Sequence, residues 1–241
     1  DTLENAVANS TDSIVPTCGS DGNRYVLVKA DQSISGGSVE FAVGGSISNN
    51  NRLHVIAYKT TPPDNDAMDN GDMDEGGAFY GGSLDAYKSY NGKSAYMVNS
   101  DADWIDIDGG NMAYDLLVFD GVDNIEIRNF KLCNVSQSTE SIIRAVNNPE
   151  CLIFRNCIFT DAKRWIDGTR IYTPRFIDCY FDSDFDQNMS GYAYLLQRAV
   201  YDRCFFDAKS GGYQLGLAGS STTVVNCIFE NGYYGIRGNG R

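Results

Sequence analysis

Short segments of alternating apolar and polar residues recur along the second half of the chain, and each changes phase at one polar residue. In "CLIFRNCIFTDA", Leu152 and Phe154 alternate as a half-buried strand should. The alternation breaks at Asn156, and Cys157 and Phe159 restart it one step out of phase. Because Asn tolerates a positive φ better than most residues, we interpret Asn156 as a corner where the backbone bends between two strands.

The same pattern occurs five times, as "IEIRNFKL", "LIFRNCIF", "RFIDCYF", "VYDRCFF" and "VVNCIF". The Phe or Cys that follows the corner occupies positions 130, 157, 179, 204 and 227, at spacings of 27, 22, 25 and 23 residues. Helical repeats keep a nearly constant length, whereas these segments have the period-2 alternation of strands and are separated by uneven Gly-, Asn- and Ser-containing stretches. The pattern therefore predicts a β-solenoid whose loops absorb the insertions.

Stacked coils lie about 4.8 Å apart, so repeated positions form columns inside such a solenoid. We predict a column of buried free thiols headed by Phe130 and a column of stacked rings headed by Leu132. A chain of disulfides is the alternative for the thiols, and a Cys133–Cys151 disulfide is an alternative outside the column, where Cys18 also lies. The thiols are Cys157, Cys179, Cys204 and Cys227, the rings are Phe159, Phe181, Phe206 and Phe229, and the corners are Asn129, Asn156, Asp178, Arg203 and Asn226.

These corners and columns resemble those of the right-handed parallel β-helix repeat proteins, a pectate-lyase-like superfold that includes bacterial and phage surface proteins. The resemblance covers residues 124–232, and "AYKTTPPDND", which starts at Ala57, is similar to a strand and turn near the start of many such proteins. It implies an all-β chain that forms a single-stranded right-handed parallel β-helix, or β-solenoid, with long loop insertions. No catalytic residue is carried over, because the polygalacturonase-like motifs "NTD", "GHG" and "RIK" do not occur.

We expect one domain with three sections. Residues 1–60 form an N-terminal cap and the first coils, residues 61–93 form a Gly/Asp-rich loop insertion, and residues 94–241 form the β-helix coils. The final coil stops part-way at "YYGIRGNGR", so we expect the native chain to continue beyond residue 241 or another subunit to cover the end. In the first half we expect a helix at 2–10 and strands at 24–30, 38–44, 52–62, 94–100, 104–110 and 115–121.

Carboxylates are concentrated in the Gly/Asp-rich insertion. Ca²⁺ takes about six to eight oxygen ligands, so a Ca²⁺ site is one interpretation of this loop and a solvated acidic loop is the other. The spacing does not follow the EF-hand pattern, and the sequence indicates no other cofactor. The candidate Ca²⁺ ligands are Asp64, Asp66, Asp69, Asp72 and Asp74.

Tyrosine is abundant, with 15 residues, and several lie in or near expected insertions. Tyrosine faces stack on sugar rings and are favoured at protein interfaces, although some of these side chains would simply pack against the coils. The candidate ligand-binding residues are Tyr80, Tyr87, Tyr90, Tyr192 and Tyr194.

The net charge, the apolar stretches and the metal-binding residue types argue against several classes of function. A net charge of −13 argues against nucleic acid as a partner, because phosphate binding needs clustered Lys and Arg. No apolar stretch approaches the roughly 20 residues of a membrane helix, so we expect no membrane insertion. His54 is the single histidine and no CxxC pair occurs, so we expect no zinc site and interpret His54, which lies in an expected strand, as structural.

Three functional hypotheses follow. The favoured one is a non-catalytic structural or adhesive β-helix of an extracellular, cell-surface or virion-surface protein, which binds glycans or sister subunits through its loops and coil faces. The second is a polysaccharide lyase or hydrolase that acts on an acidic glycan, and the third is a self-assembling homo-oligomeric subunit that stacks through open coil ends. A lyase would need a basic residue on the coil surface, and nothing singles one out. The basic candidates are Lys163, Arg164, Arg170 and Arg198, near Asp161, Asp167 and Asp202.

Overall fold

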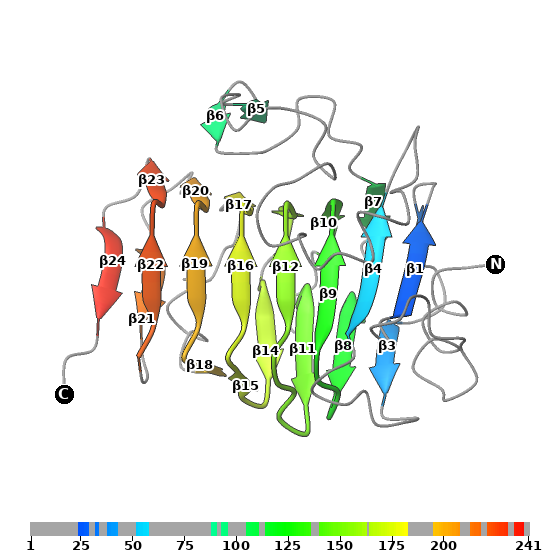
Figure 1. Ribbon diagram of the computed structural model, residues 1–241. Coiled ribbons are helices and arrows are strands. Elements are labelled where there is room, and N and C mark those ends of the chain that lie inside the picture. The colour runs from blue at the N-terminus through cyan, green and yellow to red at the C-terminus, as the bar shows by residue number, and fades with distance from the viewer. Residues whose placement is uncertain are drawn as a thin grey trace.

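The structure, a computed structural model, is a parallel β-solenoid whose coils follow one another across the molecule, from β1 to β22 (Figure 1). No α-helix occurs among the residues it describes. Within the same residues, nothing helical is long and apolar enough to span a membrane. The structure describes residues 24–28, 32–33, 38–42, 52–57, 88–90, 93–95, 105–110, 114–135, 140–162, 164–182, 195–207, 213–217, 221–230 and 234–238.

Three stacks of parallel strands form the sides of the solenoid. Sheet A contains β1 (Arg24–Val28), β4 (Leu53–Ala57), β9 (Ile125–Arg128), β12 (Ile153–Arg155), β16 (Arg175–Ile177), β19 (Val200–Asp202) and β22 (Thr223–Val225). Sheet B contains β2 (Gln32–Ser33), β7 (Ile105–Asp108), β10 (Phe130–Cys133), β13 (Ile158–Phe159), β17 (Tyr180–Asp182), β20 (Phe205–Asp207) and β23 (Ile228–Glu230). Sheet C contains β3 (Val39–Ala42), β8 (Leu117–Asp120), β11 (Ile143–Val146) and β14 (Ile166–Gly168).

Two parallel pairs complete the solenoid: β15 (Ile171–Tyr172) with β18 (Leu196–Gln197), and β21 (Tyr213–Leu217) with β24 (Tyr234–Gly238). Each central coil therefore passes from sheet A to sheet B and then to sheet C or a pair, as in β9, β10 and β11. The predicted all-β solenoid is confirmed.

The predicted corners between sheets A and B are also confirmed. Each lies between a strand of sheet A and the next strand of sheet B, and each has a positive φ, the conformation that Asn tolerates best. The φ angles are 62° at Asn129, 50° at Asn156, 53° at Asp178, 52° at Arg203 and 52° at Asn226.

The interior contains both predicted columns. Phe159, Phe181, Phe206 and Phe229 stack in order, with ring centroids 4.8, 4.8 and 4.7 Å apart and planes within 5° of parallel. Each such pair contributes about 0.5–1.5 kcal/mol beyond the area it buries. Because in-register stacking repeats the same contact from coil to coil, the column fixes the register of sheet B.

The cysteine column consists of free thiols, as predicted. Cys157, Cys179 and Cys204 are buried, whereas Cys227, in the last coil of the column, is half-buried. Cys133 and Cys151 are free as well, so the alternative disulfide between them is wrong. Their sulfurs have other neighbours, since Cys133 Sγ lies 3.8 Å from the Ile107 carbonyl and Cys151 Sγ lies 3.3 Å from Thr173 Oγ1. Cys18 lies outside the described residues.

One predicted coil strand, at 94–100, is wrong where the structure describes it, at residues 94 and 95, and its residues 96–100 lie outside the described residues. Residues Lys93–Ala95 form β6, which pairs antiparallel with β5 (Lys88–Tyr90) instead of joining a coil. Period-2 alternation suits a hairpin and a coil strand equally well. The Asn-Gly dipeptide at 91–92 was the distinguishing signal, because it is a favoured two-residue hairpin turn.

The other strands expected in the first half occur as β1, β3, β4, β7 and β8. β4 of sheet A and β7 of sheet B are the counterparts, in the preceding coil, of β9 and β10, which flank Asn129. Asn129 Nδ2 donates a hydrogen bond of 3.2 Å to the carbonyl of Ala57 at this point. The three expected sections stay predictions, and the helix expected at 2–10 lies outside the described residues.

Candidate functional site

The outward side of sheet A carries charged residues on adjacent strands. The two isoleucines of β9 pack into the core, so strand alternation places Glu126 and Arg128 on the outward side. The parallel register sets His54 of β4 beside Glu126 and Arg155 of β12 beside Arg128. Strands that are 72 residues apart in sequence thus contribute to one group of side chains, to which Arg52 also belongs.

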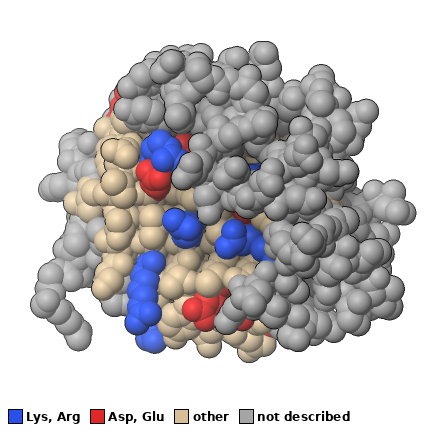
Figure 2. Space-filling view, in the orientation of Figure 1, with Lys and Arg blue, Asp and Glu red and all other residues tan. Residues whose placement is uncertain are grey.

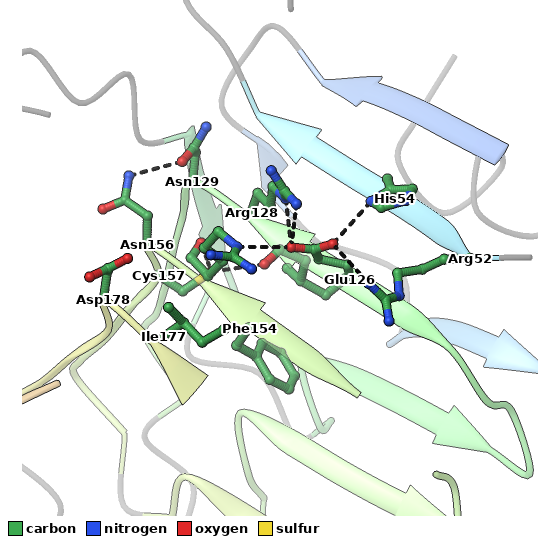
Figure 3. A network of polar contacts seen from close by, with 12 residues as sticks. Arg52, His54, Glu126, Arg128, Asn129, Phe154, Asn156, Cys157, Ile177 and Asp178 are labelled. Atoms are coloured by element: carbon green, nitrogen blue, oxygen red, sulfur yellow. Dashed lines mark hydrogen bonds and ion pairs between the residues drawn. The ribbon is translucent and has the colours of Figure 1, made fainter. Parts of the chain in front are cut away.

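These five residues form the Glu126 cluster, in which the ion pairs converge on one carboxylate (Figure 3). Glu126 Oε1 accepts hydrogen bonds from Arg128 Nε at 2.7 Å and from Arg155 Nε at 3.1 Å, and Arg128 Nη2 lies 2.6 Å from the same oxygen as an ion pair. The other oxygen, Oε2, lies 3.1 Å from His54 Nδ1 and 3.8 Å from Arg52 Nη1. The cluster therefore connects three consecutive strands of sheet A through a single acid.

Four of the five residues of the cluster are buried although it lies on the outward face, whereas the Arg52 side chain is 32% exposed. Glu126 is 0% exposed, and Arg128 and Arg155 are each 1% exposed. The apolar neighbours on the same face, Ile56 and Ile153, are buried too. Charged side chains are almost never fully buried unless they are paired, which explains the short contacts around the carboxylate.

Burial and charge oppose each other at Glu126. Burial alone would raise the pKa of its carboxyl, but Arg128, His54 and Arg155 hold that pKa well below its usual range. Burial lowers the pKa of His54, although the neighbouring carboxylate works against this shift. At neutral pH, Glu126 is therefore ionised and His54 is neutral.

This arrangement suits a structural clamp better than acid–base catalysis. A general acid or base works best with a pKa near the operating pH and needs access to substrate, and Glu126 has neither property. The expectation that His54 is structural agrees with its buried position in β4 and its contact with Glu126.

A polar ladder follows the corner beside the cluster. Asn156 Nδ2 donates to Asn129 Oδ1 at 2.9 Å, which continues the bond from Asn129 to the preceding coil. In the next two coils the corner residues are Asp178 and Arg203 instead of Asn. Arg203 donates to the Asp178 carboxylate from Nε at 2.7 Å and from Nη2 at 3.2 Å. Burial raises the pKa of Asp178 in spite of Arg203, and the hydrogen bond to Asp178 raises the pKa of Arg203.

The outward side of sheet B carries a buried apolar column. Ile158, Tyr180 and Phe205 are at most 1% exposed, with half-buried Ile228 packed against them. The rings of Tyr180 and Phe205 stack at 5.1 Å, and the Tyr180 hydroxyl donates to Asp207 Oδ2 at 3.1 Å. Parts of two outward faces of the solenoid are therefore buried, which strand alternation did not predict.

The predicted Ca²⁺ and aromatic sites are not tested by this structure. The five candidate Ca²⁺ ligands, Asp64, Asp66, Asp69, Asp72 and Asp74, lie outside the described residues, as do Tyr80, Tyr87, Tyr192 and Tyr194. Tyr90 lies in β5, where the structure describes the backbone alone. In the part of the chain that is described, no group of three or more His, Cys, Asp or Glu side chains is placed to hold a metal ion.

The basic lyase candidates do not form one constellation. Arg164 Nη1 pairs with Asp167 Oδ2 at 3.2 Å, and Asp202 pairs with Arg203 at 2.7 Å. Arg170 and Arg198 are exposed. Lys163 lies outside the described residues. Figure 2 shows basic side chains at several separate points of one face, some of them beside acids, and not as a continuous basic patch.

No protein-family model, curated protein or solved structure matches the chain. The fold and the Glu126 cluster define the class: the chain is a parallel β-solenoid repeat protein with a buried outward ion cluster.

Proposed function

We propose that this protein is a non-catalytic structural or adhesive β-helix of the right-handed, pectate-lyase-like kind, from an extracellular, cell-surface or virion-surface protein. It binds glycans or sister subunits through its coil faces. The observation that supports this proposal is a mixed charged and apolar set of exposed and partly exposed side chains on the outward side of sheet A, beyond the buried Glu126 cluster.

Beyond the Glu126 cluster, outward side chains of sheet A on β16, β19 and β22 are exposed or partly exposed. Register aligns Arg175, Val200 and Thr223 in one row, and Asp202 with Val225 in the next. Arg175 and Thr223 are exposed, Val225 is 41% exposed, and Val200 and Asp202 are partly exposed. These five residues, the sheet A patch, combine apolar and charged groups on a rigid surface, a combination that suits recognition of a sugar chain or a second subunit.

Two measurements test the proposal on the purified chain. Light scattering over a concentration series reports self-association, and retention on immobilised alginate, pectate and chondroitin reports glycan binding. We expect at least one of the two, and we expect Arg175→Glu or Val225→Asp to weaken it by about tenfold, or about 1.4 kcal/mol. Tyr114→Ser is the matched control, because Tyr114 is 52% exposed and lies outside the patch.

The outcomes separate the three hypotheses. A monomer at every concentration that retains no glycan would refute the adhesive function. Release of unsaturated uronate product from these glycans, followed by its absorbance, would establish the lyase instead. If neither patch variant weakens self-association, the result would favour stacking through the coil ends.

A further inference from the structure

Charged residues of opposite sign lie on adjacent coils along the edge where the third side of the solenoid, formed by sheet C and the strand pairs, meets sheet A. Parallel bridges align Asp123 with Glu150 and Glu150 with Tyr172, so these residues occupy three consecutive coils. The fourth coil contributes Arg198, because the residue before it, Gln197, is aligned with Tyr172. The coil of Tyr172 also contains two arginines, so the order along the edge is acid, acid, base, base. We call this set the edge strip: Asp123, Glu150, Arg170, Tyr172, Arg175 and Arg198.

The charged side chains of the edge strip form no ion pair with any residue that the structure describes. Every other basic side chain that it describes has such a partner. Glu150 and the three arginines are exposed, and Asp123 and Tyr172 are partly exposed. Like charges on adjacent coils repel each other, so the strip concentrates charge that the chain itself does not neutralise.

The backbone of Arg198 carries a second sign of an external contact. Its φ is 57°, a left-handed conformation that costs about 1–2 kcal/mol for most residues with a side chain. Arg203 also has a positive φ, but its ion pairs with Asp178 and Asp202 offset that cost. Arg198 has no ion pair of this kind within the described residues, and its side chain is exposed. A strained residue without a stabilising contact inside the chain indicates a contact outside it.

We propose that the edge strip is the contact surface of a two-fold symmetric dimer, in which the acidic half of one copy faces the basic half of a second copy. This inference rests on the proposed function, because it selects the sister subunit as the partner. Arg175 belongs to both the edge strip and the sheet A patch, so the two surfaces are continuous.

The order of charges makes the strip complementary to itself. A two-fold axis normal to the strip, between its second and third coils, exchanges the acidic and basic halves, as an isologous contact requires. Glu150 of each copy then lies opposite Arg170 and Arg175 of the other copy, and Asp123 lies opposite Arg198. Tyr172 lies at the centre, where a tyrosine is favoured in protein interfaces.

The same order favours a second copy over an acidic glycan as the occupant. A polyanion that followed the strip from coil to coil would meet the basic half and then the acidic half, which would repel it. The net charge of −13 would add to this repulsion. A second copy carries the same net charge, but its acids and bases face their opposites along the whole strip.

Complementary charge changes test the contact on the full chain. One variant, with a basic strip, combines Glu150→Arg with Asp123→Asn, which keeps an oxygen to accept the backbone N–H of residue 150. The other, with an acidic strip, combines Arg170→Glu, Arg175→Glu and Arg198→Glu. Light scattering over a concentration series measures the mass of each variant and of their equimolar mixture. The salt concentration is about 0.15 M, where a Debye length of about 8 Å screens the net charges but preserves close pairs.

We expect the native chain to form a dimer. Each variant alone should have a dissociation constant raised at least about tenfold, because like charges then face each other. The equimolar mixture should regain the native affinity as a heterodimer. Glu40→Arg is the matched control and should dimerise normally, because Glu40 is exposed and lies in β3 of sheet C, outside the strip.

Circular dichroism and thermal unfolding check that both variants keep the fold, and the single changes Glu150→Arg and Arg198→Glu replace any variant that does not. The proposal is overturned if the variants self-associate as the native chain does, if their mixture does not associate, or if the native chain forms open assemblies of increasing mass. A monomer that is retained on alginate, pectate or chondroitin would overturn the dimer and leave the adhesive function in place. A monomer that binds none of them would overturn both.

Discussion

Replacing Glu126 by Gln should destabilise the solenoid far more than an ordinary loss of one charge. Gln has nearly the same size, so packing changes little, but the guanidinium groups of Arg128 and Arg155 lose their shared buried counter-charge. Breaking a buried ion pair by removing one partner costs about 3–5 kcal/mol. Since Gln still offers one carbonyl oxygen as an acceptor, we expect a loss of about 3 kcal/mol in the free energy of unfolding.

Equilibrium urea unfolding, followed by circular dichroism, measures this loss. Arg144→Gln is the control, because the Arg144 side chain is 44% exposed and its buried partner Asp115 keeps two hydrogen bonds from Ser141, so we expect a loss of about 1 kcal/mol. Glu126→Asp keeps the charge but shortens the side chain, so it should cost less than Glu126→Gln. The reasoning is refuted if Glu126→Gln costs no more than Arg144→Gln, or if Asp is worse than Gln, since the cluster would then act through packing and not through charge.

Four further predictions follow from particular contacts. The pKa of Glu126 is lower in the folded protein than its unfolded value of about 4.3, so the ionised carboxylate stabilises the fold above that pH. This stabilisation is lost as the pH falls through the folded pKa. In acid-unfolding curves, the difference in stability between the native chain and Glu126→Gln should therefore shrink only below about pH 4. Asn156→Ala should cost about 1–2 kcal/mol more than Asn156→Gly in urea unfolding, because both lose the amide ladder but only Ala strains the positive φ, and equal losses would contradict the corner assignment. Phe181→Ala should cost about 3–5 kcal/mol, because it opens a cavity inside the ring column, and a much smaller loss would mean that the column is not close-packed. Gly168→Ala should abolish soluble expression or lower the thermal midpoint sharply, because a Cβ there would lie 2.0 Å from the Ala145 carbonyl oxygen at a φ of 106°, and an unchanged midpoint would show that the backbones are not this close.

The sequence predicted the interior of the solenoid well because the interior obeys a local rule. A phase change at Asn129 or Asn156 fixes which neighbours point inward, and the position of a residue relative to its corner then identifies the equivalent residues of successive coils, although the coils differ in length. Neither inference needs knowledge of distant segments. This is why the ring and thiol columns could be predicted residue by residue, whereas the hairpin at β5 and β6 could not be distinguished by alternation alone.

The Glu126 cluster was missed because alternation treats every outward residue as solvent-exposed. Whether an outward side chain is buried depends on what lies over the sheet, and the pairing of His54 with Glu126 joins strands that are far apart in the sequence. One signal was available. Arg128 and Arg155 each directly precede a corner Asn, so in-register stacking places two like charges side by side, and such a pair requires a nearby acid.

At the corners, the residues of adjacent coils depend on each other in pairs. Asn suits the positive φ, and stacked amides also bond to each other, as Asn156 does with Asn129. Asp178 and Arg203 depart from this pattern together, since Arg203 adopts a φ that is costly for a long side chain while its guanidinium holds the buried Asp178 carboxylate in two bonds. The charge-assisted bonds offset the backbone strain, so each substitution makes sense only with the other in place.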